Sequence, residues 1–203
     1  MCIRDRRAVV AFARDRGVRV VPEIDTPGHV GAWLAGAPGL VVNCSAAVGA
    51  TPPSGMLEVA LDATRELVAA LLAELAAVFP DAHFHLGTDE VNVPCLETSA
   101  SVAAELAARG LPLDVEGVLL LVREWIQFAQ EQLVGLGKVP VAWEEALDKY
   151  GPGASAWPPP SAAINDGLVP GSVIQIWKSP AWYDPATGPV SYTHLTLPTI
   201  LLV

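Results

Sequence analysis

Two adjacent carboxylates, Asp89 and Glu90, follow an apolar run in the segment FHLGTDEVNVPC, residues 84–95. Gly87 lets the chain turn where the strand-like run ends. An adjacent acidic pair often marks only a solvated turn or a helix N-terminus, where carboxylates suit the helix dipole. Paired carboxylates in the mouth of a barrel, however, are the groups that cleave glycosidic bonds. The segment therefore indicates either a structural turn or a hydrolytic site, and the surrounding elements must decide between them.

The surrounding sequence alternates between helical patterns and short β-rich runs. Helices are predicted where apolar residues recur at helical spacing and a glycine or proline ends the pattern. Strands are predicted where short runs are rich in β-branched residues. The predicted helices are residues 6–17, 57–80 and 114–137, and the predicted strands are residues 18–25, 82–87, 138–145 and 172–177. Residues 26–45 and 149–167 are rich in glycine and proline and are predicted to be loops.

Strands that alternate with helices predict an α/β fold with a parallel sheet and helices outside it. Three predicted strands deliver polar or aromatic residues at their C-terminal ends: Asp25, the Asp89–Glu90 pair, and Trp143 with Glu144. A (β/α)8 TIM barrel builds its active site from such strand ends. With about four strands and their helices, the chain is predicted to be a partial barrel. A doubly wound sheet is the alternative, but no glycine-rich phosphate loop opens a helix.

Composition narrows the classes of partner. The 203 residues carry 12 Lys+Arg against 22 Asp+Glu, a formal net charge of −10, which disfavours binding to a nucleic-acid backbone. Hydrophobic residues make up 52% of the chain, enough for a buried core rather than a disordered segment. Charged residues interrupt the best helical candidate for a membrane span, residues 61–79, so no membrane partner is predicted.

The two ends of the chain are related at the level of DNA. The opening residues MCIRDR and the stretch VSYTH, residues 190–194, can be encoded by inverted copies of one DNA segment. Such a pair resembles read-through of a sequencing adapter. We therefore expect residues 1–6 and 190–203 to be non-native, and residues 7–189 to be a fragment of a TIM-barrel catalytic domain.

Four segments of the chain resemble signatures of one enzyme family. VVPEIDTPGHVGAW and HLGTDEV resemble two signature segments of the family 20 glycoside hydrolases, the β-N-acetylhexosaminidases. VAWEE and VIQIW resemble two later strands of the same barrel, and order and spacing agree over residues 7–178. The resemblance implies retaining hydrolysis of terminal β-linked N-acetylhexosamine, GlcNAc or GalNAc, with no metal and no cofactor. The partners would be N-acetylhexosamine-terminated glycans or chito-oligosaccharides.

The resemblance gives the two carboxylates different roles. Glu90 would be the general acid that protonates the glycosidic oxygen and later activates water. Asp89 would hold the acetamido N–H, while the acetamido oxygen of the substrate itself attacks C1 and forms an oxazolinium ion. Strand geometry favours such a division, because neighbouring side chains on a strand point to opposite sides. We therefore expect Asp89 and Glu90 to point apart and to serve two parts of one sugar.

Further polar residues match the family motifs. A lone loop histidine is most often structural, but the match places His29 in the pocket, in the network around the acid. The match also implies that Asp25 orients the groups that contact substrate, and that His85 braces the turn that carries the carboxylates. Thr88 stands where many members of the family have glycine.

Aromatic residues near the strand ends have two interpretations. Buried tryptophans usually belong to the core, whereas the family match makes Trp143 and Trp177 walls that enclose the terminal sugar and its acetamido methyl group. Tyr183, in the segment SPAWYDP, resembles the family's acetamido-binding tyrosine. It follows Trp177 too closely for another helix and strand to intervene, so the likeness is local. Of Glu144 and Glu145, one would line the pocket and the other would begin a helix.

Cys44 and Cys95 lie in loops that leave the same face of the predicted barrel. Two unrelated thiols are one interpretation, and the resemblance to animal lysosomal members implies a disulfide between them. A disulfide implies an oxidising compartment, so the complete protein is expected to be secreted, lysosomal or vacuolar. Its signal peptide would lie upstream of the fragment. A homodimer of the full-length enzyme is compatible with these expectations.

Two alternatives to an active glycosidase stay open. A non-catalytic homologue would keep the aromatic walls and bind chito-oligosaccharides, although retention of both Asp89 and Glu90 argues against it. A zinc-dependent barrel hydrolase would use His83 and His85, two positions that share one side of a strand. For the family 20 interpretation, the fragment lacks barrel strands that complete the pocket, so the isolated chain is expected to be inactive.

Overall fold

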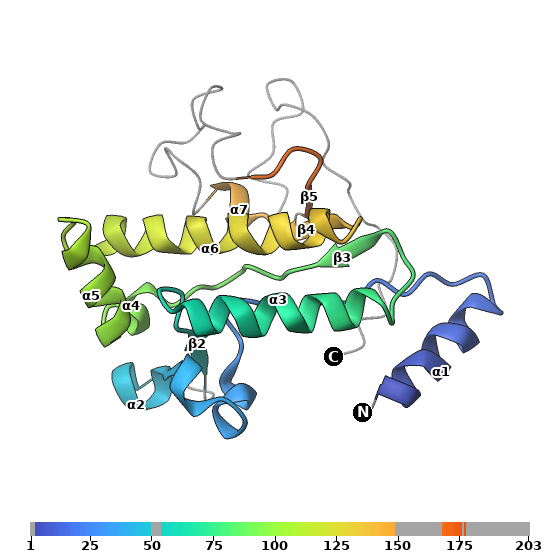
Figure 1. Ribbon diagram of the computed structural model, residues 1–203, viewed down its shortest axis with the longest axis horizontal. Helices are drawn as coiled ribbons and strands as arrows, with labels where there is room; N and C mark the ends of the chain where they lie inside the picture. The colour runs from blue at the N-terminus through green and yellow to red at the C-terminus, as the bar shows by residue number, and fades with distance from the viewer. Residues whose placement is uncertain (1–2, 50–53, 149–167, 176, 178–203) are drawn as a thin grey trace.

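The computed structural model describes residues 3–49, 54–148, 168–175 and 177 (Figure 1). The helices are α1 (Ile3–Arg14), α2 (Cys44–Val48), α3 (Asp62–Ala76), α4 (Val93–Leu96), α5 (Ala100–Ala108), α6 (Val115–Gly135) and α7 (Glu145–Asp148), with 3-10 helices η1 (Gly31–Ala35) and η2 (Pro38–Leu40). The strands are β1 (Val41–Asn43), β2 (Gly55–Leu57), β3 (His83–His85), β4 (Val139–Trp143) and β5 (Val173–Gln175). From α3 onward helical segments separate the strands β3, β4 and β5, as the sequence predicts.

Three strands form a parallel sheet in the order β3–β4–β5, with His85 opposite Val141 and Val141 opposite Val173. The predicted strand over residues 18–25 is much shorter in the structure, where only Glu23 forms a bridge, parallel to β3 at His85. Pro22 has no N–H to donate, so its carbonyl alone pairs with β3, accepting from His85 N at 2.9 Å. With that bridge, the described residues supply four adjacent parallel positions, which is the predicted partial (β/α)8 arrangement.

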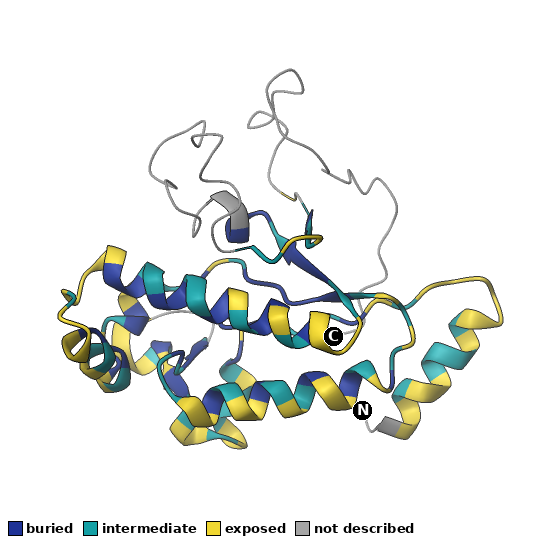
Figure 2. Ribbon diagram, turned by 45° about the horizontal axis from the view of Figure 1, so that its top comes forward, coloured by how far each residue is buried: buried dark blue, intermediate teal, exposed yellow. Residues whose placement is uncertain are grey.

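The two long helices α3 and α6 pack against each other beside the sheet (Figure 1). α6 buries residues at helical spacing, among them Val122, Trp125 and Ala129, and Figure 2 shows the buried sides of the helices in dark blue. Trp125 on α6 and Phe84 on β3 are completely buried and belong to one core. α3 begins at Asp62 rather than at residue 57, because residues 55–57 pair as β2.

The segment of residues 31–57, called here the 31–57 lobe, contains more regular structure than the predicted loop. η1 and η2 lead into β1, which pairs antiparallel with β2, so that Val42 lies opposite Met56. Three-residue strands are too short for a period-two pattern to show in the sequence. The lobe also contains α2, whose first residue is Cys44.

α1 lies apart from the other helices (Figure 1), and none of residues 4–14 is buried. The helix ends at Arg14, and Gly17 has a left-handed φ of +71°, close to the predicted stop. No described helix is both long and apolar enough to cross a membrane.

Candidate active site

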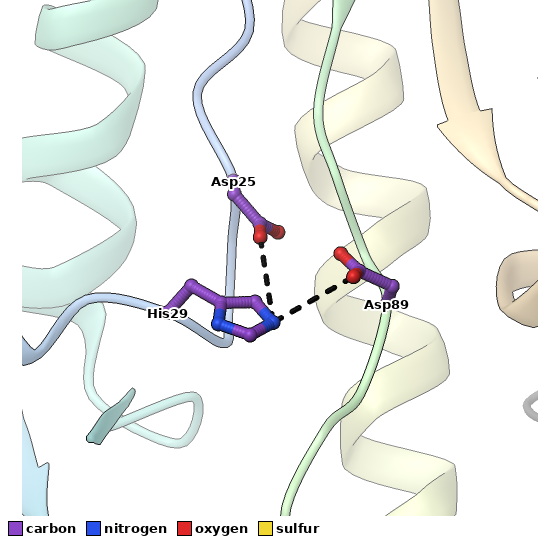
Figure 3. A group of neighbouring side chains, drawn as sticks. All are labelled: Asp25, His29 and Asp89. Carbon is purple, nitrogen blue, oxygen red and sulfur yellow. Dashed lines mark ion pairs between the residues drawn. The ribbon is translucent and has the colours of Figure 1, made fainter. Parts of the chain in front are cut away.

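The carboxyl ends of the parallel positions bring Asp25, His29 and Asp89 together (Figure 3). His29 Nε2 lies 3.8 Å from Asp25 Oδ2 and 3.6 Å from Asp89 Oδ2. The same nitrogen lies 3.5 Å from Glu90 Oε2. One imidazole thus faces three carboxylates that come from the two motifs singled out in the sequence. These four residues are called the strand-end cluster below.

Left-handed backbone angles bring the adjacent carboxylates to the same histidine. Thr88 has a φ of +81°, Glu90 of +49° and His29 of +55°, values that non-glycine residues rarely adopt. Asp89 and Glu90 lie beyond β3, so strand alternation does not govern them, and the expectation that they point to opposite sides is wrong. They differ instead in exposure, which is 18% for the Asp89 side chain and 58% for that of Glu90.

Backbone contacts hold the turn that precedes the carboxylates. The Gly87 N–H donates to His85 Nδ1 at 2.9 Å, and the Thr88 N–H donates to Asp25 Oδ1 at 3.0 Å. Gly87 has a φ of +68°, and a Cβ at this position would lie 1.8 Å from Asp25 Oδ1, so only glycine fits. Asp25 and His85 therefore lie directly against the turn, and each accepts one of its two backbone hydrogen bonds.

Electrostatics divide the protons among the clustered groups. Burial, and after it the charge of Asp89, raises the pKa of Asp25 to about 8. Contact with Asp89 raises the pKa of His29 to about 9 against the opposing effect of burial. Burial favours a higher pKa for Asp89, but the interaction with His29 outweighs it, and the pKa of Asp89 is lowered. At neutral pH the cluster therefore holds a neutral Asp25, a protonated His29 and an ionised Asp89.

Asp89 keeps one hydrogen-bond acceptor unused. Its Oδ1 atom is buried and accepts no hydrogen bond, while Oδ2 faces His29. Leaving a buried acceptor without a donor costs about 1–3 kcal/mol. The neighbouring Asp25 also lowers the pKa of Asp89, so a protonated Asp25 can serve this carboxylate from within the protein. Glu90 beside it is largely exposed. The arrangement can bind an N–H group and exchange a proton with a neighbouring atom of the same ligand.

Trp143 ends β4, and its indole N–H donates to Glu23 Oε1 at 3.0 Å. Its ring packs on that of His85, with 4.6 Å between the ring centroids. Glu23 was not among the residues singled out from the sequence. The alternation of side chains along a strand could have identified it, because Glu23 lies two residues before Asp25 and shares one face of the extended segment with it.

Trp177 lies beyond the end of β5 and is 48% exposed. Its indole N–H donates to Glu145 Oε2 at 3.0 Å. Glu145 is the first residue of α7, and both it and Glu144 are buried. Tyr183 lies outside the residues that the structure describes. Of the two neighbouring acids, Glu145 therefore begins a helix and also anchors a tryptophan.

Cys44 and Cys95 form a disulfide, with 5.3 Å between their Cα atoms. Both residues are completely buried. The bond joins α2 in the 31–57 lobe to α4, the short helix that follows Glu90. The expected disulfide is thus present, and it fastens the segment after the carboxylates to the lobe.

The structure does not support a zinc site at His83 and His85. His83 Nδ1 lies 2.9 Å from Arg19 Nη2, and His85 Nδ1 accepts the Gly87 N–H. In the described part of the chain, the side chains close enough to share a metal ion are those drawn in Figure 3, and they include neither histidine.

Comparisons with known proteins agree with this geometry. The family model "Glycosyl hydrolase family 20, catalytic domain" matches residues 3–187. The chain is 30% identical to the beta-hexosaminidase subunit alpha of Bos taurus over 175 residues, covering 86% of this chain and 30% of that protein. It is 29% identical to the beta-hexosaminidase subunit beta of Homo sapiens over 178 residues, covering 88% and 29%. The chain therefore spans about a third of the length of these curated relatives.

A solved structure shows the same fold. The GH20 exo β-N-acetylglucosaminidase from Vibrio harveyi, in complex with N-acetylglucosamine, matches with a TM-score of 0.66 and 26% identity. The match covers 88% of this chain and 26% of that chain. The parallel α/β barrel segment and the family match together define a barrel glycoside hydrolase domain. The chain belongs to glycosyl hydrolase family 20, as part of the catalytic domain, and the predicted partial TIM barrel is confirmed.

Proposed function

We propose that the complete protein containing this chain hydrolyses terminal, non-reducing β-linked N-acetylhexosamine, with retention of configuration. The observation that carries the proposal is the pairing of a partly buried Asp89, whose pKa is lowered by His29, with the accessible carboxyl group of Glu90. An N-acetylhexosamine offers one group to each of them, an acetamido N–H and a glycosidic oxygen. Similarity to two beta-hexosaminidase subunits supports the same activity.

In the proposed reaction, Glu90 donates a proton to the glycosidic oxygen as the C1–O bond breaks and the leaving group departs as an alcohol. The acetamido oxygen bonds to C1 from the opposite side and forms an oxazolinium ion. Asp89 accepts the acetamido N–H and balances the positive charge. The Glu90 carboxylate then takes a proton from water as the water oxygen attacks C1 and reopens the ring. Two inversions at C1 give net retention.

The rest of the cluster supports the charge of Asp89. Protonated His29, with Nε2 3.6 Å from Asp89 Oδ2, keeps the pKa of Asp89 low despite burial. Asp25, held by the Thr88 N–H, adds no second negative charge while it stays protonated, because burial raises its pKa. Asp89 is therefore ready to receive a positive charge before substrate binds.

The proposed substrates are glycans and chito-oligosaccharides that end in GlcNAc or GalNAc. Trp143 and Trp177 would line the site for the terminal sugar. The buried disulfide between Cys44 and Cys95 supports a secreted, lysosomal or vacuolar location, because disulfides persist in oxidising compartments. We propose that the full-length enzyme, whether monomer or homodimer, works without a metal or cofactor, and that this segment alone is inactive.

The test is to express the complete protein and follow hydrolysis of aryl β-GlcNAc and β-GalNAc. Glu90→Gln should lower kcat by about 10²–10⁴-fold, because it removes the proton donor. Glu131→Gln is a matched control, since Glu131 is exposed on α6, where it accepts from Gln127, and should leave kcat unchanged. A thiazoline mimic of the oxazolinium should inhibit.

Three outcomes would contradict parts of the proposal. Full activity in Glu90→Gln would remove Glu90 as the acid, and failure of the thiazoline to inhibit would remove substrate assistance. Binding of chito-oligosaccharides by the wild-type protein without any turnover would favour the non-catalytic homologue.

We also propose that residues 7–189 are the native part of the chain. The end of the family match at residue 187 supports the second boundary, whereas α1 and the match both include residues 3–6. Reading the gene from an independently prepared library tests both boundaries. If that library shows the same codons for residues 1–6, the boundary at residue 7 is wrong. If it shows the same codons for residues 190–203, the boundary at residue 189 is wrong.

A further inference from the structure

We propose that Glu23 is a positioning residue that orients the indole of Trp143 and thereby sets how the site fits the N-acyl group of its substrate. The inference rests on the proposed function and adds a residue that the motifs did not identify. It concerns a group of three side chains from three adjacent parallel positions: Glu23, His85 on β3 and Trp143 on β4.

The three side chains form one layer across the sheet. Glu23 bridges to His85 in the backbone, and His85 is opposite Val141, two residues before Trp143. Residues two apart on a strand share a face, so the indole lies on the same side of the sheet as the imidazole. The ring contact at 4.6 Å agrees with this arrangement. Glu23 and Trp143 then meet across β3, where the indole N–H reaches Glu23 Oε1 at 3.0 Å.

Glu23 has no comparable bond to His85. Its Oε1 lies 3.6 Å from His85 Nδ1, beyond hydrogen-bond range, and that nitrogen already accepts the Gly87 N–H. Burial lowers the pKa of His85 to about 4, so the ring is neutral and offers no charge to the carboxylate at neutral pH. The hydrogen bond from Trp143 is therefore the specific interaction of the Glu23 side chain.

The bond fixes the orientation of a ring that also packs on His85. An indole has a single hydrogen-bond donor. When that donor is engaged, the ring cannot flip, so the same ring face and edge are always turned toward the pocket. One side of Trp143 packs on His85, and its N–H edge is held by Glu23. Trp143 as a whole is half-buried, at the end of β4. In the proposed function Trp143 contacts the acetamido methyl group.

A double-mutant cycle tests whether Glu23 acts through Trp143. In the complete protein, Glu23→Met removes the acceptor at similar volume, and Trp143→Phe removes the donor. Each should lower the kcat/KM ratio of N-acetyl over N-propionyl aryl glycosides by about tenfold, the scale of one hydrogen bond to a charged group. The double variant should match Trp143→Phe alone, because the pair acts as a unit. Additive losses would overturn the inference.

Two further variants separate positioning from general destabilisation. Glu23→Gln keeps an oxygen that can accept the indole N–H, so it should preserve the N-acyl ratio within about threefold. Glu58→Met is the matched control, because it removes the bonds from Ser99 at 2.5 Å and Ser101 at 2.6 Å without touching Trp143. It should lower the melting temperature but leave the ratio unchanged. A Glu23→Gln protein as impaired as Glu23→Met would contradict the inference.

A second readout needs no turnover. The Trp143 indole N–H resonance, assigned by its loss in Trp143→Phe, should shift and exchange faster with solvent in Glu23→Met but not in Glu58→Met. If the wild-type protein does not hydrolyse the glycosides yet this resonance responds, the proposed function fails and the orientation by Glu23 stands. If hydrolysis occurs and the resonance does not move, the inference about Glu23 fails alone.

Discussion

The turn that carries the strand-end carboxylates and the 31–57 lobe satisfy their polar groups differently. Among the described residues, three buried side-chain atoms without a hydrogen bond lie at that turn, in His85, Thr88 and Asp89, three lie elsewhere, in Thr64, Gln130 and Ser172, and none lies in the lobe. In the lobe the Asn43 side chain caps α2, and Cys44 is sealed in a disulfide. Unused polar atoms are unfavourable for folding, so the turn beside the carboxylates is less completely satisfied than the lobe. We therefore expect the lobe to contribute mainly stability and the cluster to carry the proposed chemistry.

Removing the disulfide should have the largest effect on stability. The bond closes a loop with a sequence separation of 51, and we expect Cys44→Ala with Cys95→Ala to lower the free energy of unfolding by about 4 kcal/mol. Denaturant unfolding of the complete protein measures the loss, and reduced wild-type protein is the control. Equal stability of the variant and the oxidised wild type would show that the lobe does not depend on its disulfide.

Gly87→Ala should disturb the strand-end cluster directly, by displacing Asp25. The added Cβ would lie 1.8 Å from Asp25 Oδ1 and 2.7 Å from Asp25 Cα, so the backbone must move. Left-handed strain and overpacking together should cost about 3 kcal/mol and should also abolish activity. Gly110→Ala is the matched control, because Gly110 has the same φ of +68° with nothing within 4 Å.

The comparison of these two glycines isolates the clash. Gly110→Ala should cost about 1 kcal/mol, the price of the backbone angle alone, and leave activity intact. Thermal unfolding and turnover of both variants provide the measurement. Equal losses of stability in the two variants would mean that Asp25 moves aside freely and that the turn is not fixed by close packing.

The sequence predicted the elements with long periodic patterns and missed those set by tertiary contacts. α6 follows its helical pattern almost residue for residue, whereas the strand over residues 18–25 shrinks to one bridge because Pro22 lacks a donor. The motifs located Asp89 and His29, since their residue types and spacing are local. The left-handed angle of Glu90, which turns it toward His29, depends on packing that no local pattern encodes.

Stability should fall as pH rises, through the protons that the cluster holds. The folded-state pKa of Asp25 is raised from 3.8 to about 8, and that of His29 is raised from 6.5 to about 9. The folded state binds more protons than the unfolded state between the two pKa values of each group, from 3.8 to about 8 for Asp25 and from 6.5 to about 9 for His29. The corresponding stability therefore declines as pH rises across these ranges and is lost by about pH 9. Unfolding in denaturant at a series of pH values measures the trend.

Asp25→Asn isolates the contribution of that carboxyl group. The variant keeps an oxygen for the Thr88 N–H but cannot titrate. The free energy of unfolding of the wild type, relative to that of the variant, should decrease between neutral pH and about pH 9. A difference that is independent of pH would contradict a raised pKa for Asp25.

Glu90→Gln should have the smallest effect on stability although it removes the proposed acid. The Glu90 side chain is 58% exposed, so the free energy of unfolding should change by less than about 0.5 kcal/mol. Asp89→Asn should cost more, because Asp89 is more buried and its charge supports the raised pKa of His29. Denaturant unfolding of both variants and NMR titration of His29 measure the contrast. If Glu90→Gln were the less stable of the two, Glu90 would hold the fold together, and its exposure would not mark it as the group free to meet a substrate.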